Sequence, residues 1–170
     1  GNGTQDAFWD DPRVLFASLH GWPLYPGTGA AEERGAHGNV LNLPLPAGTG
    51  HEGWLECVRE AVVPSLRAHR PDVVLVSAGY DAHHRDPLGN LRLVGRTYHA
   101  CIALLRDVQP RLACVLEGGY DLLGLAEGVH ATAAAMLGEP CPPMEEPLPG
   151  LRPWAQLAPR VLGAHPGLAP

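Results

Sequence analysis

The sequence predicts an α/β fold built on an open parallel sheet with helices on both faces. Two apolar runs, Val73–Val76 and Leu112–Leu116, show no alternation with polar residues, which is typical of strands buried on both faces of a parallel sheet. Stretches with helical spacing of apolar residues separate and follow these runs, and such alternation indicates right-handed βαβ units. Each run leads directly into a polar loop, the place where open α/β sheets bind ligands.

The composition is that of one soluble globular domain. The chain has 170 residues, of which 45% are hydrophobic and 18% charged, and this length suits a single core. The net charge of −6 argues against a nucleic-acid partner, which selects basic surfaces. No run approaches the roughly 18 apolar residues that a membrane span needs, and no signal peptide is evident. The four cysteines lack CxxC spacing, so we expect free thiols and a cytoplasmic protein.

The first quarter of the chain predicts two strands separated by a long loop. A short helix is expected over residues 4–10, and a strand over residues 13–20. Residues 21–38 are rich in glycine and proline without a periodic apolar face, which indicates a loop. The run over residues 40–45 contains Pro44, which suits an edge strand or a strand end.

The middle of the chain predicts three helices around the two apolar runs. Residues 52–69 carry apolar side chains at helical spacing, but Pro64 should bend or split this helix. Further helices are expected over residues 94–107 and 123–137. We therefore place the α/β unit in residues 1–138.

Residues 139–170 differ in character, because half of the chain's 18 prolines lie in the last 33 residues. We expect an irregular, proline-rich tail that is draped over the domain or partly disordered. A short helix is compatible with the sequence near residues 153–162.

Asp81 is the first candidate for chemistry, because it follows the first apolar run directly. A carboxylate at the end of a buried strand is held rigidly enough to bind a metal ion, although a capping or turn role fits equally well. His83 and His84 stand beside it and suggest a local Asp81/His83/His84 metal site as one alternative. The other is that both histidines are solvated loop residues.

Tyr120 is the second candidate and follows the second apolar run. The preceding Gly118 and Gly119 allow the backbone to approach a ligand closely. A phenol at this place could donate a hydrogen bond to a developing oxyanion, or could simply pack at a strand-to-helix junction. Parallel strands would bring Tyr120 and Asp81 to the same edge of the sheet.

Four segments taken in order resemble landmarks of the histone deacetylase and acetylpolyamine amidohydrolase family, most closely its class II and bacterial branch. They are Gly1-Asn-Gly-Thr-Gln5, Ser77-Ala-Gly-Tyr-Asp-Ala82, Asp86-Pro-Leu-Gly89 and Leu116-Glu-Gly-Gly-Tyr120. The resemblance covers about residues 1–138. It implies an arginase-like fold and zinc-dependent hydrolysis of N-acetyl-lysine or another N-acetyl amine.

The resemblance also implies roles for individual residues. Asp81 corresponds to a zinc ligand, Tyr120 to the catalytic tyrosine that polarises the acetyl carbonyl, and Asn2 to a residue that orients a catalytic histidine. The acyl-lysine channel and its floor correspond to Tyr25, Leu88, Gly118 and Gly119. Family members that prefer acetylpolyamines carry an acidic residue in place of Leu88, so acyl-lysine is the expected substrate. Structural monovalent cations such as K⁺ correspond to sites near Ser18 and Leu19 and at carbonyls around Phe8, Asp11, Val14 and Asn39.

One departure from the family decides how this chain is interpreted. The other two zinc ligands and the general-base histidines of the family precede the position of Gly1, so this chain holds one of three expected ligands. We therefore expect the C-terminal half of a deacetylase catalytic domain, inactive alone and completed by a missing N-terminal half. The alternative is a truncated, non-catalytic binding or interaction domain of the same fold.

Overall fold

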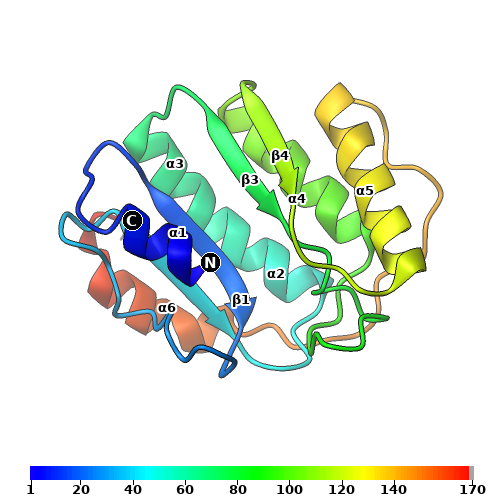
Figure 1. Ribbon diagram of the computed structural model, residues 1–170, viewed down its shortest axis with the longest axis horizontal. Coiled ribbons are helices and arrows are strands. Elements are labelled where there is room, and N and C mark those ends of the chain that lie inside the picture. Colours follow the sequence, from blue (N-terminus) through cyan, green and yellow to red (C-terminus); the bar gives the residue numbers. More distant parts are fainter. Residues whose placement is uncertain (169–170) are drawn as a thin grey trace.

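The chain folds around two pairs of parallel strands. In the computed structural model, which describes residues 1–168, β1 (Phe16–Gly21) pairs with β2 (Val40–Leu45) and β3 (Val74–Ala78) pairs with β4 (Leu112–Leu116) (Figure 1). Phe16 lies opposite Val40 and Val74 lies opposite Leu112. The predicted parallel arrangement is therefore confirmed. Within residues 1–168, no strand pairing joins the two sheets.

The N-terminal elements are shorter than predicted and shifted along the chain. Helix α1 covers Asn2–Ala7 rather than residues 4–10. Strand β1 begins at Phe16 rather than at Arg13, because the Asp11 carboxylate accepts hydrogen bonds from the backbone and guanidinium N–H groups of Arg13 at 2.7–3.0 Å. A turn closed in this way ends before an extended strand can begin.

The predicted helix over residues 52–69 is present and accommodates Pro64 without a break. Helix α2 (His51–Cys57) continues through one π-helical turn, η1 (Val58–Val62), into α3 (Val63–His69). Proline lacks an N–H group and its ring collides with the carbonyl four residues earlier. The wider π turn lies just before Pro64 and gives its ring room without ending the helix.

Helices α4 (Gly95–Val108) and α5 (Leu122–Leu137) cover one face of the β3–β4 sheet (Figure 1). Val74 and Ala78 point into the core below these helices, together with Tyr98, Ile102 and Leu105 of α4. The opposite face is bare in the described part of the chain, where Leu75 is 71% and Val115 57% exposed. Strands of parallel sheets are normally covered on both faces.

The proline-rich segment is draped over the domain and contains the short helix that the sequence allowed. Helix α6 (Trp154–Ala164) buries Leu157 and Val161 against the core. Before it, Leu151 forms a parallel bridge with Thr49, which ties the tail to the start of α2.

A 3₁₀ turn, η2 (Pro166–Leu168), ends the described chain. Among the described residues, no helix is both long and apolar enough to cross a membrane. The four cysteines are free, as their spacing predicts.

Candidate active site

The loops that follow β3 and β4 are joined to one another by backbone hydrogen bonds. The N–H of Glu117 donates to Ala78 O at 3.1 Å, and the N–H of Tyr80 donates to Gly118 O at 2.7 Å. Strand pairing thus continues beyond the sheet into the polar loops. Residues 79–89 and 117–121 therefore form one structural unit at the carboxyl edge of the sheet.

Asp81 lies against the backbone of the second loop. A Cβ atom at Gly118 would collide with Asp81 Oδ2, and a Cβ atom at Gly89 would collide with Asp81 O. Both positions therefore require glycine for close approach. Burial, and after it the charge of Asp86, raises the pKa of the Asp81 carboxyl. A carboxylate whose ionised form is disfavoured in this way is a candidate ligand for a cation, which would stabilise its charge.

Asp86 is the carboxylate that links the two loops. It is 8% exposed, its Oδ2 accepts from Tyr120 N at 2.7 Å, and its Oδ1 accepts from Leu88 N and Gly89 N at 2.9 and 3.0 Å. Burial alone would raise the pKa of this carboxyl, but the N–H groups of Tyr120, Leu88 and Gly89 lower it overall. Asp86 thus closes the turn of its own loop and also contacts the second loop at Tyr120.

Tyr80 anchors the start of the first loop. Its ring is 5.1 Å from that of Tyr98 in an edge-to-face arrangement, and its hydroxyl donates to Thr132 Oγ1 at 3.1 Å. Tyr98 in turn donates to Tyr80 O at 3.3 Å. A Cβ atom at Gly128 would collide with the Tyr80 ring. Tyr80 is therefore a core residue, and it fixes the backbone position from which the Asp81 side chain extends.

The interpretation of His83 as a solvated loop residue is wrong. Its side chain is 1% exposed, and its Nδ1 accepts from Arg85 N at 3.3 Å. Nε2 is therefore the protonated nitrogen, and it lies 3.4 Å from Glu127 Oε2, too poorly aligned for a regular hydrogen bond. Burial lowers the pKa of His83, although Glu127 opposes this effect. His83 is thus a neutral core residue that joins the loop to α5.

His84 differs from its neighbour because it lies at the surface of the loop. Its Nε2 is 3.0 Å from Glu145 Oε2, and Arg85 Nη2 reaches the same oxygen at 3.0 Å. The tail is therefore held over the loop by a half-exposed ion cluster. Sequence spacing gave no sign of Glu127 or Glu145, which lie 44 and 61 residues beyond His83 and His84.

The residues present do not by themselves form a complete metal site. Within residues 1–168, no group of three or more His, Cys, Asp or Glu side chains could hold a metal ion. The local Asp81/His83/His84 alternative is therefore wrong, since His83 faces Glu127 instead. Asp81 fits the role of a single ligand, whereas zinc in catalytic sites takes three protein ligands.

The expected channel residues lie on exposed loops. Leu88 is 69% and Tyr25 98% exposed, and the candidate catalytic residue Tyr120 is 61% exposed. The loop of Leu88 and the loop of Tyr25 are neighbours, because a Cβ atom at Gly21 would lie 2.7 Å from Asn90 Oδ1. No described contact joins Tyr25 to Asp81. Gly118 lies against the Asp81 side chain and Gly119 against Tyr80, and Asn2 is exposed at the start of α1.

The carbonyl oxygens expected to bind a monovalent cation are engaged by an amide group. Asn39 Nδ2 donates to the carbonyls of Phe8, Asp11 and Val14 at 2.8, 3.2 and 3.2 Å. The N–H of His37 donates to Asn39 Oδ1 at 3.3 Å, which fixes this orientation of the amide. Because these carbonyls surround the amide nitrogen of Asn39, they do not fit a cation in addition to it.

The second set of residues expected near a cation lies on β1. Ser18 Oγ is 2.9 Å from His20 Nδ1, and His20 Nε2 is 3.0 Å from Gly29 O. Leu19 follows Ser18 in the strand and pairs with Leu43. Ser18 therefore takes part in a chain of side-chain contacts that fastens the loop after β1.

A buried polar network beside β2 was missed in the sequence. Glu33 accepts from Gln5 Nε2 at 2.6 Å and from the N–H groups of Gly29 and Ala30 at 3.0 and 3.1 Å. Gln5 Oε1 accepts from Asn42 Nδ2 at 2.7 Å. The network joins α1 to the 27–36 loop and to β2. Its members come from three separate segments, so no local sequence motif indicates the network.

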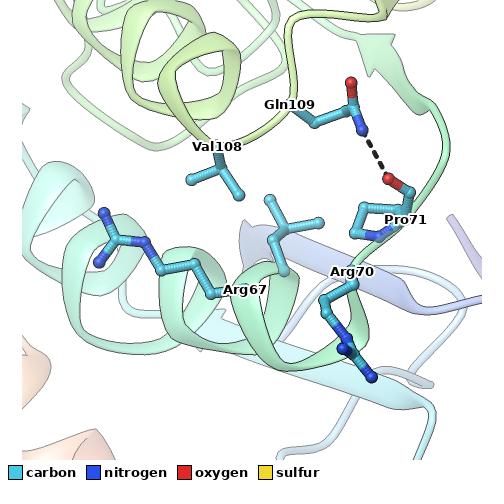
Figure 2. A pocket seen from close by; sticks show the side chains of 6 residues that line it. Arg67, Arg70, Pro71, Val108 and Gln109 are labelled. Carbon is cyan, nitrogen blue, oxygen red and sulfur yellow. Dashed lines mark hydrogen bonds between the residues drawn. The ribbon is translucent and has the colours of Figure 1, made fainter.

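The cavities described in the structure lie away from Asp81 and Tyr120. One of about 280 Å³ is lined by Leu66, Arg67, Arg70, Pro71, Val108 and Gln109, where Gln109 Nε2 donates to Pro71 O at 2.6 Å (Figure 2). Pro71 and Gln109 precede β3 and β4, so this cavity is at the opposite edge of the sheet. A second, of about 570 Å³, lies between the loop around His37 and the end of α6.

Comparison with known proteins identifies the family. The family model described as the histone deacetylase domain matches residues 1–136. "Histone deacetylase 10, chloroplastic" of Oryza sativa subsp. japonica is 44% identical over 148 residues, with 82% of this chain and 33% of the relative covered. A "Probable deacetylase" of Archaeoglobus fulgidus is 40% identical over 156 residues, with 86% and 44% covered.

The solved structures agree with the sequence comparison. The HDA15 HD domain superimposes with a TM-score of 0.85 at 31% identity, with 98% of this chain and 48% of that chain covered. The chain therefore spans less than half the length of these relatives and has part of their arginase-like α/β fold. On its sequence, its parallel strands and its match over residues 1–136, this chain belongs to the histone deacetylase family.

Proposed function

We propose that this chain supplies one part of the active site of a zinc-dependent deacetylase that hydrolyses N-acetyl-lysine-type amides. The observation that carries the proposal is the joined pair of loops after β3 and β4. Together they hold Asp81 and Tyr120 at the same edge of a parallel sheet. Family membership alone would not distinguish an active from an inactive member, whereas this arrangement retains both residues.

In this proposal the two side chains have different tasks. Asp81 is one of the zinc ligands, and zinc, when bound, acts as a Lewis acid toward the amide carbonyl. Tyr120 donates its phenolic hydrogen to the same carbonyl oxygen as negative charge develops on it, which lowers the barrier to attack by water. Asn2 orients one of the histidines that move protons, and these histidines come from outside the described residues.

The proposal requires further polypeptide to complete the site. The bare face of β3–β4, with Leu75 71% and Val115 57% exposed, supports a covering layer that residues 1–168 do not supply. The relatives are more than twice as long as the part that this chain matches. We therefore expect the 170-residue chain to be inactive alone and to bind zinc weakly.

The substrate and the compartment are part of the same proposal. Leu88, apolar and exposed beside the Asp86 turn, favours the aliphatic part of an acyl-lysine over a cationic polyamine. The free cysteines support a reducing compartment such as the cytoplasm. The rice relative, by contrast, is named chloroplastic.

A second candidate function is a non-catalytic interaction domain of the same fold. The two functions differ in what they require of Tyr120, because only catalysis needs its hydroxyl group. The test compares the full-length protein with its Tyr120→Phe variant on an acetyl-lysine peptide. We expect turnover to fall about 100- to 1000-fold, as for other single oxyanion donors, with zinc content unchanged. Full-length protein without activity, or a variant as active as the wild type, would favour the interaction domain.

A further inference from the structure

We infer that Asp86 is a positioning residue for Tyr120, an inference that rests on the proposed function of Tyr120. Asp86 belongs to the loop after β3, and Tyr120 belongs to the loop after β4. The 2.7 Å hydrogen bond from Tyr120 N to Asp86 Oδ2 is a direct link between them. It sets the distance between the loop that carries the proposed metal ligand and the residue that carries the phenol.

Among residues 1–168, few contacts hold the side chain of Tyr120, so the backbone link gains importance. Its side chain is 61% exposed and thus lacks the packing that fixes a buried tyrosine. The residue before it, Gly119, has φ +135°, a conformation that glycine adopts readily and other residues rarely. The backbone N–H of Tyr120 is therefore the point at which its position is determined.

The two oxygens of Asp86 have separate partners. Oδ1 accepts from Leu88 N and Gly89 N and closes the turn of its own loop, whereas Oδ2 reaches across to Tyr120. An acceptor with two oxygens and a negative charge serves three N–H donors well. The carboxyl is 8% exposed, so water does not compete strongly for these bonds.

Because the two oxygens of Asp86 have different partners, a substitution can break the link to Tyr120 and leave the turn intact. Asp86→Asn keeps one oxygen for the turn but places an NH₂ group opposite the N–H of Tyr120, where two donors repel each other. Asp86→Ser gives a second variant, since a serine hydroxyl still accepts from the turn N–H groups but is too short to bridge to the second loop. Both variants preserve the turn and break the link.

The experiment is a double-mutant cycle in the full-length protein, with turnover of an acetyl-lysine peptide, KM and zinc content measured for each variant. We expect Asp86→Asn to lower kcat by up to about 100-fold, the scale of a misplacement near 1 Å. KM and zinc content should remain unchanged. In the Tyr120→Phe background the same substitution should have little further effect, because its action runs through the lost hydroxyl.

Asp121→Asn is the matched control. It removes a charge one residue from Tyr120 but keeps the oxygen that accepts from Gly124 N at 2.7 Å, so kcat should stay near the wild-type value. If the losses of kcat in Asp86→Asn and Tyr120→Phe multiply in full in the double variant, the positioning role alone is overturned. Loss of zinc in Asp86→Asn and Asp86→Ser would overturn it as well. A Tyr120→Phe variant with normal kcat would overturn the proposed function and the positioning role together.

Discussion

Replacing His83 by alanine should destabilise the protein strongly, although His83 lies in a loop beside the partly exposed His84. The side chain is 1% exposed and packs between the loop and α5, where Gly124 leaves room for it: a Cβ atom there would lie 2.9 Å from His83 Nδ1. Truncation opens a cavity and removes the acceptor for the N–H of Arg85.

The magnitude follows from these two losses. Large-to-small substitutions in cores cost about 2–5 kcal/mol, and one buried donor left without a partner costs about 1–3 kcal/mol. Because the imidazole is smaller than a phenyl ring and Arg85 N gains access to water, we expect a total of about 2–4 kcal/mol. For a unit of this size each kcal/mol lowers Tm by about 2–4 °C.

His84→Ala is the internal control for this prediction. Its side chain is 18% exposed and its ion pair is with Glu145, so its removal should cost about 0–1 kcal/mol, as for other surface pairs. The assay is urea unfolding of the two full-length variants, followed by circular dichroism, with Tm as a second measure. Equal stability losses in the two variants, or a loss below about 0.5 kcal/mol in His83→Ala, would refute the burial argument.

Three further predictions concern separate parts of the fold. Asn39→Ala should open the Phe8, Asp11 and Val14 carbonyls to a cation, so its Tm should rise more with KCl than the Tm of the wild type. A bulky organic cation keeps the ionic strength constant in this measurement, and an equal rise of Tm in both proteins would contradict the prediction. Burial raises the pKa of Cys57 from 9.0 to about 12, so the folded state keeps a proton that the unfolded state loses, and the free energy of unfolding should fall as the pH rises from 9 toward 12. Cys57→Ala should show a shallower slope in that range, and identical slopes would refute this origin. Gly128→Ala should lower the unfolding free energy by about 1–3 kcal/mol, because the new methyl group collides with the Tyr80 ring, whereas Gly163→Ala, with open space around it, should be neutral or slightly stabilising in urea unfolding.

Much of the fold could be predicted because its signals are local. The uninterrupted apolar runs of β3 and β4 and the periodic apolar residues of α4 and α5 lie within single segments. Pro64 shows where local signals are no longer sufficient. Its incompatibility with a regular helix was evident, but the π turn that accommodates it depends on how the flanking residues pack.

The organisation of the site could be predicted only in part. Asp81 and Tyr120 were found because each comes just after an uninterrupted apolar run that predicts a strand of a parallel sheet. His83 and His84 are identical neighbours in the sequence, yet one is buried because Gly124 and Glu127 of α5 meet it. Asp86 reads locally as a turn residue, and its second partner is 34 residues away. Contacts of this kind are decided by how strands and helices pack and leave no local signal.

The zinc content of the full-length protein and of its Asp81→Ala variant tests the central claim most directly. If Asp81 is a ligand in a site completed from outside this chain, the wild type should purify with about one zinc per protein. The variant should lose both the zinc and the activity, while its urea unfolding curve, measured on zinc-free samples, stays close to that of the wild type. An Asp81→Ala protein that retains its zinc and its turnover would contradict the assignment of this loop to the metal site.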